Sequence, residues 1–201
     1  GRQMAYASNA RNNRDFDIYV RATTDGQGDP RRVLEAQGHH EAQDFSADGR
    51  QLAVIEEHSS FDTDLYLVDV TAGTGRNLTA HQGQGDIRYF NARFTRDGRS
   101  MYVLSDYGRE YVNLAVMSTA PGSSGLVFVL EEPHDIDAME FSRVSATLAV
   151  VVNVDGWSQL RLYDASNPVQ LRELTRPTIP PGVITTLVWS GVVAFVAVLV
   201  Q

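Results

Sequence analysis

A short motif recurs along this chain at an interval of about 48 residues. Residues 45–50 read FSADGR, residues 94–99 read FTRDGR and residues 141–146 read FSRVSA, while Trp189-Ser190 begins a further copy. Each copy is followed by a short apolar run, such as QLAVI after the first and SMYVL after the second. A motif kept at a fixed interval indicates that the chain repeats one supersecondary unit.

Each repeat predicts four consecutive antiparallel strands. An aromatic residue ends the first strand, and Asp-Gly supplies the positive backbone angles of a tight hairpin turn. The second and third strands alternate, as Leu52 with Val54 and Leu65 with Leu67 illustrate. The other face of the second strand is uncharged as well, with Ala53, Tyr102 and Ala149, so we expect the sheets to be covered on both faces. A fourth strand is predicted near residues 31–34, 76–79, 126–130 and 171–175.

Four short strands in a repeat of this length are typical of a β-propeller blade. An ordinary β-sandwich is the alternative, but a sandwich does not need one motif at a fixed period. The sequence therefore predicts an all-β fold, a partial propeller with about four repeats. The expected blades span residues 1–41, 42–90, 91–138 and 139–186, with the start of a fifth at 187–201.

Composition excludes several classes of function. The net charge is −8 and the basic residues are scattered, whereas a nucleic-acid surface needs clustered positive charge. The chain has no cysteine, which rules out disulfides, thiolate metal sites and cysteine nucleophiles. No signal peptide is visible, which favours the cytoplasm. We expect no nucleic-acid partner and no membrane partner.

Three segments resemble the propeller of the prolyl oligopeptidase family of serine peptidases, whose blades share the TolB-like repeat. These segments are NVDGWSQLRLYD at residues 153–164, IPPGVI at 179–184 and SDYGRE at 105–110. The resemblance implies a non-catalytic propeller that restricts peptide access to a C-terminal α/β-hydrolase domain. That domain carries the Ser, Asp and His triad, with the serine in a Gly-x-Ser-x-Gly elbow. The implied partners are therefore this hydrolase domain and the peptide substrates of the parent protein.

The elbow is absent from this sequence. Residues 122–125, GSSG, have the wrong spacing and are interpreted as a turn. We therefore predict no catalytic residue in this chain, and we expect the chain alone to be inactive. A TolB-like propeller that acts as a protein-binding scaffold is the alternative function.

Other polar groups are interpreted as structural. His39 and His40 are adjacent, so in an extended segment they point to opposite faces. The remaining histidines, His58, His81 and His134, do not have the spacing of metal ligands. The aspartates near residue 64, which are Asp62, Asp64 and Asp69, do not have the spacing of an EF-hand loop. Two glutamate pairs, Glu56-Glu57 and Glu131-Glu132, invite comparison with the glutamates by which dipeptidyl peptidases hold a substrate amino terminus, but they match no motif and are interpreted as strand ends. We predict no metal site and no cofactor.

The two ends of the chain indicate a fragment. Residues 1–7 (GRQMAYA) match residues 49–55 (GRQLAVI), so Gly1 corresponds to the glycine of a turn whose first half is missing. Residues 183–200 form an uncharged run that is just long enough for a membrane helix. Their β-branched residues favour two strands instead. We expect the first strand to end at Trp189-Ser190 and the second to contain Val193, Ala194 and Phe195. A closed four-bladed ring would leave that last strand without a place, so we expect an incomplete ring with exposed edges and possible self-association.

Overall fold

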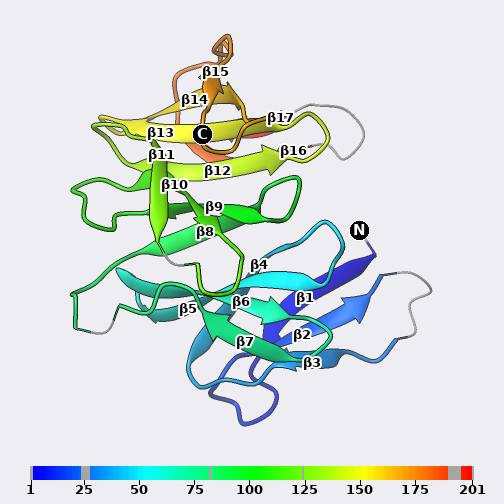
Figure 1. The fold of residues 1–201 in the computed structure, drawn as a ribbon. Coiled ribbons are helices and arrows are strands. Elements are labelled where there is room, and N and C mark those ends of the chain that lie inside the picture. Colours follow the sequence, from blue (N-terminus) through cyan, green and yellow to red (C-terminus); the bar gives the residue numbers. More distant parts are fainter. Residues whose placement is uncertain (1, 24–27, 82, 124, 190–195, 201) are drawn as a thin grey trace. The chain divides into compact units, whose positions relative to one another are not determined.

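The chain folds entirely into antiparallel β-sheets. The computed structural model describes residues 2–23, 28–81, 83–123, 125–189 and 196–200, and these form 17 strands and no helix. Five sheets follow one another along the chain (Figure 1). Among the described residues, no helix has the length and apolar character that a bilayer crossing requires.

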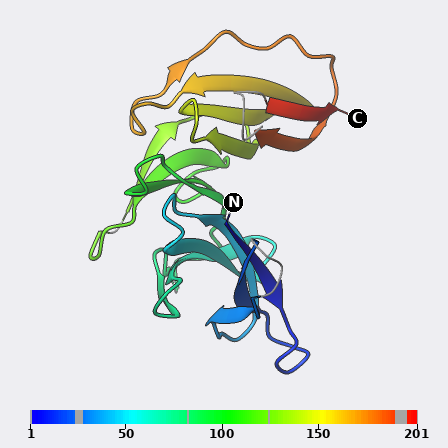
Figure 2. The same ribbon diagram turned by 90° about the vertical axis from the view of Figure 1, so that its right-hand side faces the viewer.

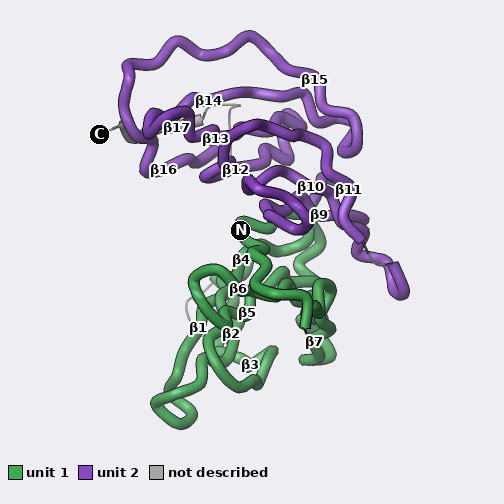
Figure 3. The backbone as a smooth tube through the Cα atoms, turned by 90° about the vertical axis from the view of Figure 1, so that its left-hand side faces the viewer, with its two compact units in different colours: residues 1–94 green, residues 95–201 purple. Residues whose placement is uncertain are grey.

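The chain divides into two compact units, residues 1–94 and 95–201 (Figure 3). In the first unit, the first sheet contains β1 (Gln3–Ser8), β2 (Asp17–Ala22) and β3 (Arg31–Leu34) in that order. The second sheet contains β4 (His39–Phe45), β5 (Gln51–Ser59), β6 (Asp62–Asp69) and β7 (Thr74–Asn77), again in chain order. β8 (Tyr89–Phe94) is the last strand of this unit.

The third sheet has the order β11-β10-β9-β8, with β9 (Ser100–Ser105), β10 (Asn113–Ser118) and β11 (Leu126–Leu130). The fourth contains β12 (Ile136–Ser142), β13 (Thr147–Val154), β14 (Trp157–Asp164) and β15 (Arg172–Glu173). β16 (Ile184–Trp189) and β17 (Val196–Val200) pair as a fifth, two-stranded sheet. The fold class predicted from the repeat is thus confirmed at the level of its sheets.

The predicted fourth strands are also confirmed. β3 and β11 have the expected bounds, and β7 and β15 lie within two residues of them. Ala53, Tyr102 and Ala149 are fully buried, as are Leu52 and Leu148 on the other face of the same strands. Both faces of these sheets are therefore covered, as the absence of charges at these positions predicts.

The FSADGR turn differs from the predicted tight turn in one respect. Of the Asp-Gly pair, only Gly49 has a positive φ, at 70°. The Gly49 amide donates to the Ser46 carbonyl at 2.9 Å, and the Ser46 hydroxyl donates to Asp48 Oδ1 at 2.7 Å. The serine and aspartate side chains thus stabilise a longer loop in which glycine alone needs the left-handed conformation. A two-residue Asp-Gly turn occurs instead between β13 and β14, where Asp155 and Gly156 have φ values of 52° and 85°.

Apolar side chains from successive sheets form the cores within each unit. In the first unit, Ile18 and Val33 of the first sheet share one buried cluster with Leu52, Val54 and Val68 of the second. In the second unit, Ala149, Val151 and Leu160 of the fourth sheet pack with Leu187 of β16. Figures 1 and 2 show β16 lying beside β12. The Trp189 indole N–H also donates to the Glu140 carbonyl at 2.9 Å.

The apolar run near the C-terminus contains two strands, which agrees with the strand interpretation of residues 183–200. β16 ends at Trp189, as predicted. Ser190, Val193, Ala194 and Phe195 lie outside the described residues, as does Gly1. The blade boundaries given above stay a prediction.

Candidate functional site

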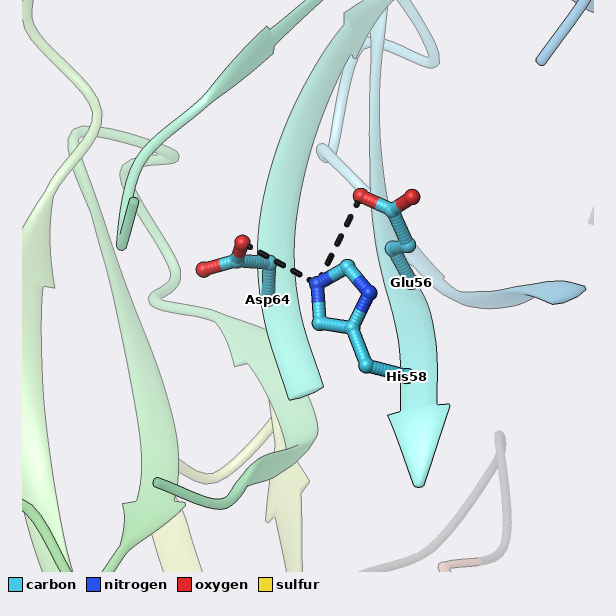
Figure 4. Close-up of side chains that lie close together, drawn as sticks. All are labelled: Glu56, His58 and Asp64. Atoms are coloured by element: carbon cyan, nitrogen blue, oxygen red, sulfur yellow. Dashed lines mark hydrogen bonds and ion pairs between the residues drawn. The ribbon is translucent and has the colours of Figure 1, made fainter. Parts of the chain in front are cut away.

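A cluster of polar side chains lies where β5 ends and β6 begins in the second sheet. Glu56 lies on β5, and His58 follows it at a β-bulge between Glu57 and Ser59. Asp64 of β6 is the cross-strand partner of Glu56 in the antiparallel register. The hairpin that joins the two strands therefore brings these three side chains together, and we call them the His58 cluster (Figure 4).

His58 lies between the two carboxylates. Its Nε2 atom is 3.3 Å from Asp64 Oδ2 and 3.9 Å from Glu56 Oε2. One potential ligand atom from each residue lies within 4.8 Å of the other two. The side chains of Asp64 and Glu56 are 9% and 19% exposed, whereas His58 is 40% exposed. The cluster is therefore largely buried on the carboxylate side and open to solvent at the imidazole.

Hydrogen bonds hold Asp64 in place. Its Oδ2 accepts from the Asn77 amide at 2.9 Å, and its Oδ1 accepts from the Thr79 hydroxyl at 2.9 Å. Burial opposes ionisation of this carboxyl, but the hydrogen bonds from Asn77, Thr79 and His58 outweigh it and lower its pKa below the ordinary value. Asp64 is thus a fixed negative charge near neutral pH.

His81 connects Asp64 to a second aspartate. Its Nδ1 lies 3.2 Å from Asp64 Oδ1 and 2.9 Å from the Thr79 carbonyl, and its Nε2 lies 2.8 Å from Asp62 Oδ1. Burial alone would lower the pKa of this imidazole, but its bonds to the Thr79 carbonyl and Asp62 raise the pKa above its usual value. His81 thus links the carboxylates of Asp62 and Asp64.

His40 of β4 lies next to Glu56 on the buried side of the His58 cluster. It is the cross-strand partner of Glu56, and its Nε2 lies 3.9 Å from Glu56 Oε1. Its side chain is only 2% exposed, and Nδ1 has no hydrogen-bond partner among the described residues. Burial lowers the pKa of this histidine, so the ring is neutral at pH 7.

The neighbouring residues on the same strands face the other way. His39 Nδ1 contacts Glu57 Oε2 at 2.9 Å, and both side chains are 46% exposed. A small pocket of about 190 Å³ on that face is lined by His39, Glu57, Arg88 and Phe90 among others. The expectation that His39 and His40 point to opposite faces is confirmed.

The other groups considered in the sequence do not join the cluster. Glu131 pairs with Arg109 and Glu132 with Arg161, and Asp69 accepts hydrogen bonds from the amides of the turn after β6. In the GSSG segment, the Ser123 amide donates to the Ala120 carbonyl at 3.2 Å, which is a turn between β10 and β11. Ser124 lies outside the described residues.

Sequence spacing did not predict the His58 cluster. His58 and Asp64 are six residues apart with a turn between them, a distance that matches no familiar ligand motif. The register of β5 with β6 brings them together, and a β-bulge between Glu57 and Ser59 sets that register. Without the bulge, the two-residue turn at 60–61 would pair Asp64 with Glu57, so strand alternation alone predicts the wrong partner. The signal in the sequence was the repeat, because the corresponding positions of the other repeats carry neither glutamate nor histidine.

No family model matches the chain, and no curated protein matches it by sequence. Solved structures do match. The putative TolB of Agrobacterium tumefaciens has a TM-score of 0.67 at 17% identity, over 86% of this chain and 61% of that one. Prolyl oligopeptidase B of Galerina marginata has a TM-score of 0.69 at 15% identity, over 94% of this chain and 27% of that one.

This chain has the propeller fold shared by TolB and the prolyl oligopeptidases. Oligopeptidase B of Leishmania major matches as well, with a TM-score of 0.59 at 14% identity over 88% of this chain and 26% of that one. The propeller described here thus spans about a quarter of the peptidases' length and about three fifths of that TolB.

Proposed function

We propose that this chain is a non-catalytic propeller segment of a serine peptidase of the prolyl oligopeptidase type. In this role it limits which peptides reach an α/β-hydrolase domain of the same parent protein. The similarity to prolyl oligopeptidase B over 94% of the chain supports this proposal. At 15% identity that similarity concerns the fold, so the functional proposal depends on particular segments of this chain.

The observation that carries the proposal is the contact between two of the peptidase-like segments. The Ser158 amide, in NVDGWSQLRLYD, donates to the Gly182 carbonyl in IPPGVI at 3.0 Å. The Ile184 amide donates back to the Ser158 hydroxyl at 2.9 Å. The two segments thus form one structural connection, from the third strand of one blade to the first strand of the next, and they support the proposal as a single feature.

A second function rests on the TolB similarity. That match covers 61% of the TolB chain, a larger share than the 27% covered in the peptidase. It supports a propeller that binds other proteins through its surface and has no hydrolase domain.

The coding sequence beyond Gln201 distinguishes the two functions. The first predicts that it continues into an α/β-hydrolase domain with a Gly-x-Ser-x-Gly elbow. A reading frame that ends after further blades, without a hydrolase, would refute the peptidase function and favour the scaffold.

A labelling experiment tests the claim that the propeller is catalytically empty. The 201-residue chain is incubated with a fluorophosphonate probe, with a known serine peptidase as the positive control. We expect no labelling of this chain. Stoichiometric labelling that heat denaturation abolishes would contradict the proposal.

A further inference from the structure

The positions of the His58 cluster can be compared between blades because the repeat provides an internal reference. Glu56 is four residues after Leu52, and the same step leads to Ser8, Ser105 and Val152 in the other blades. His58 corresponds in the same way to Ala10, Tyr107 and Val154. In the other blades, therefore, neither position carries an ionisable side chain that could bind a metal near neutral pH, which shows that a blade can form without Glu56 and His58.

The contrast is sharpest with the fourth blade. There the cross-strand pair Ile136 and Val152 occupies the place of His40 and Glu56, and both apolar side chains are fully buried. The second blade puts an imidazole and a carboxylate in the same position, although burying polar groups is unfavourable unless they are well paired. Since His40 Nδ1 has no hydrogen-bond partner among the described residues, this pairing is incomplete.

Unlike Glu56 and His58, Asp64 has closely similar counterparts at the same position in other blades. It corresponds to Asp17 and Asn113, because each of the three pairs with the equivalent position of the second strand in its blade. Gln159 occupies this position in the fourth blade. Asn113 Oδ1 accepts from the Glu132 amide at 2.6 Å, and Asp17 Oδ1 accepts from the Ala36 amide at 3.3 Å. The repeat thus uses this side chain to hold the segment after the fourth strand. In the second blade, the fixed carboxylate that results faces two groups that the repeat does not require.

We propose that Glu56, His58 and Asp64 bind one divalent first-row metal ion, for which zinc is the test ion. Two carboxylates and one imidazole are a ligand set that zinc and its neighbours accept, whereas calcium and magnesium prefer oxygen ligands alone. This binding site goes beyond the proposed role of the propeller and does not depend on it.

The distances suit such an ion. Ligand bonds of about 2.0–2.2 Å place neighbouring donor atoms roughly 3–3.5 Å apart. His58 Nε2 and Asp64 Oδ2 already have this separation, at 3.3 Å, and Glu56 Oε2 is 3.9 Å from the same nitrogen. All three donor atoms lie within 4.8 Å of one another, so the Glu56 oxygen has to move closer to the other two when the ion binds. Because His58 is 40% exposed, the ion can enter from solvent and keep water in its remaining positions.

The surrounding groups favour a cation. Three carboxylates, those of Glu56, Asp62 and Asp64, lie in or beside the cluster, so a bound cation would offset their negative charge. His40 Nε2 lies 3.9 Å from the Glu56 oxygen that is not directed at His58. His40 is a positioning residue that restricts the Glu56 carboxylate, as outer groups commonly do around metal ligands.

Calorimetric titration with zinc chloride tests the proposal on the whole chain after treatment with a chelator and desalting. We expect one ion per chain. His58→Ala gives β5 the residue of the first blade, and Glu56→Ser gives it the residue of the first and third blades. Each variant should bind zinc at least tenfold more weakly while unfolding at a midpoint close to that of the parent.

His39→Ala is the matched control, because His39 is an exposed histidine beside a glutamate on the opposite face. Its zinc affinity should stay within twofold of the parent. Asp64→Asn is a further variant: asparagine occupies this position in the third blade, and its single amide oxygen can keep one of the hydrogen bonds that Asp64 accepts from Asn77 and Thr79 while the charge is removed. We expect it too to bind at least tenfold more weakly.

Cobalt(II) gives a readout besides affinity. Its visible absorption bands should appear with the parent and His39→Ala and be lost with His58→Ala. No saturable zinc binding by the parent would overturn the proposal, since the cluster would then be a hydrogen-bond network only. Equal loss of affinity in His39→Ala and His58→Ala, or no loss in His58→Ala, would overturn it as well by indicating adventitious surface binding.

Discussion

Transplanting the apolar pair of the fourth blade into the second should stabilise the protein. The double variant His40→Ile/Glu56→Val gives β4 and β5 the residues of Ile136 and Val152, which are cross-strand partners at the equivalent position. Replacing a buried polar or ionic pair by apolar residues of similar volume is often neutral or stabilising, by about 1–4 kcal/mol. If the double variant is more stable than the parent, His40 and Glu56 do not serve the stability of the fold; if it is less stable, they do.

The structure gives an expected size for the change in the free energy of unfolding. The buried Nδ1 of His40, unpartnered among the described residues, carries a desolvation penalty of about 1–3 kcal/mol that isoleucine removes. Glu56 is 19% exposed, so solvent reduces the desolvation penalty that this carboxylate carries. The contact between His40 Nε2 and Glu56 Oε1 is also lost, but at 3.9 Å it is too long for a hydrogen bond. We expect a net stabilisation of about 1–3 kcal/mol, or a rise of roughly 2–12 °C in the unfolding midpoint for a chain of this size.

The assay is urea unfolding of the metal-free protein at pH 7, followed by tryptophan fluorescence and circular dichroism in parallel. Coincident transitions are required before free energies are compared. The single variant His40→Ile serves as the control, because it removes the buried imidazole and keeps Glu56. A double variant that is less stable than the parent would refute the reasoning, because His40 and Glu56 would then contribute to the fold itself. The double variant should also lose zinc binding.

Three further predictions concern residues outside the His58 cluster. The Tyr102 hydroxyl is buried with no hydrogen-bond partner among the described residues, so Tyr102→Phe should raise the free energy of unfolding by about 1 kcal/mol; a lower value in urea titrations would contradict this. Burial opposes ionisation of Asp17, but its bonds with Arg11 and the Ala36 amide lower its pKa. Its stabilising effect is therefore complete above the unfolded pKa of about 3.9 and is lost as the pH falls through the lower folded value. Asp17→Asn should flatten that part of an acid titration of stability, and an unchanged profile would count against it. Ser46→Ala removes the hydroxyl that donates to Asp48 and accepts from the Gln51 amide; we expect a loss of about 1 kcal/mol, measured by thermal unfolding, and no loss would show that Gly49 alone maintains the turn.

The strands could be predicted because their determinants are local. An aromatic residue, a turn and an alternating run lie within about twelve residues. Because the chain repeats this pattern, a strand with a weak signal in one repeat can be placed by comparison with a repeat in which the signal is clear. β15 illustrates this point: only Arg172 and Glu173 form the strand, which propensity would not reveal, but the period places it. The turn type was less predictable, because Ser46 and Asp48 form side-chain hydrogen bonds that change which residue needs a positive φ.

The His58 cluster could not be predicted from spacing, because its geometry depends on the register between strands. His58 approaches Asp64 across a hairpin, and His81 reaches the same carboxylate from beyond the fourth strand. A one-residue change of register would move Glu56 and His58 to the other face of the sheet. The available signal was the repeat itself: Glu56 stands where other blades have serine or valine.

This comparison separates two kinds of polar residue in a repeat protein. Blades bury their apolar faces against their neighbours, so a feature that helps a blade to form tends to recur at the same position. Asp17, Asp64 and Asn113 occupy one such position in three of the four blades, with Gln159 in the fourth. Each of the three holds the segment that follows its fourth strand or a residue in it. His40, Glu56 and His58 occur in one blade only, and the fourth blade shows that apolar residues can occupy two of these three positions when buried. Groups that are costly to bury, unnecessary for the repeat and gathered around one fixed carboxylate are the part of this surface that blade formation does not explain. A bound ion explains them together, because it needs the charge of Asp64 and Glu56 and the exposed nitrogen of His58 at one point.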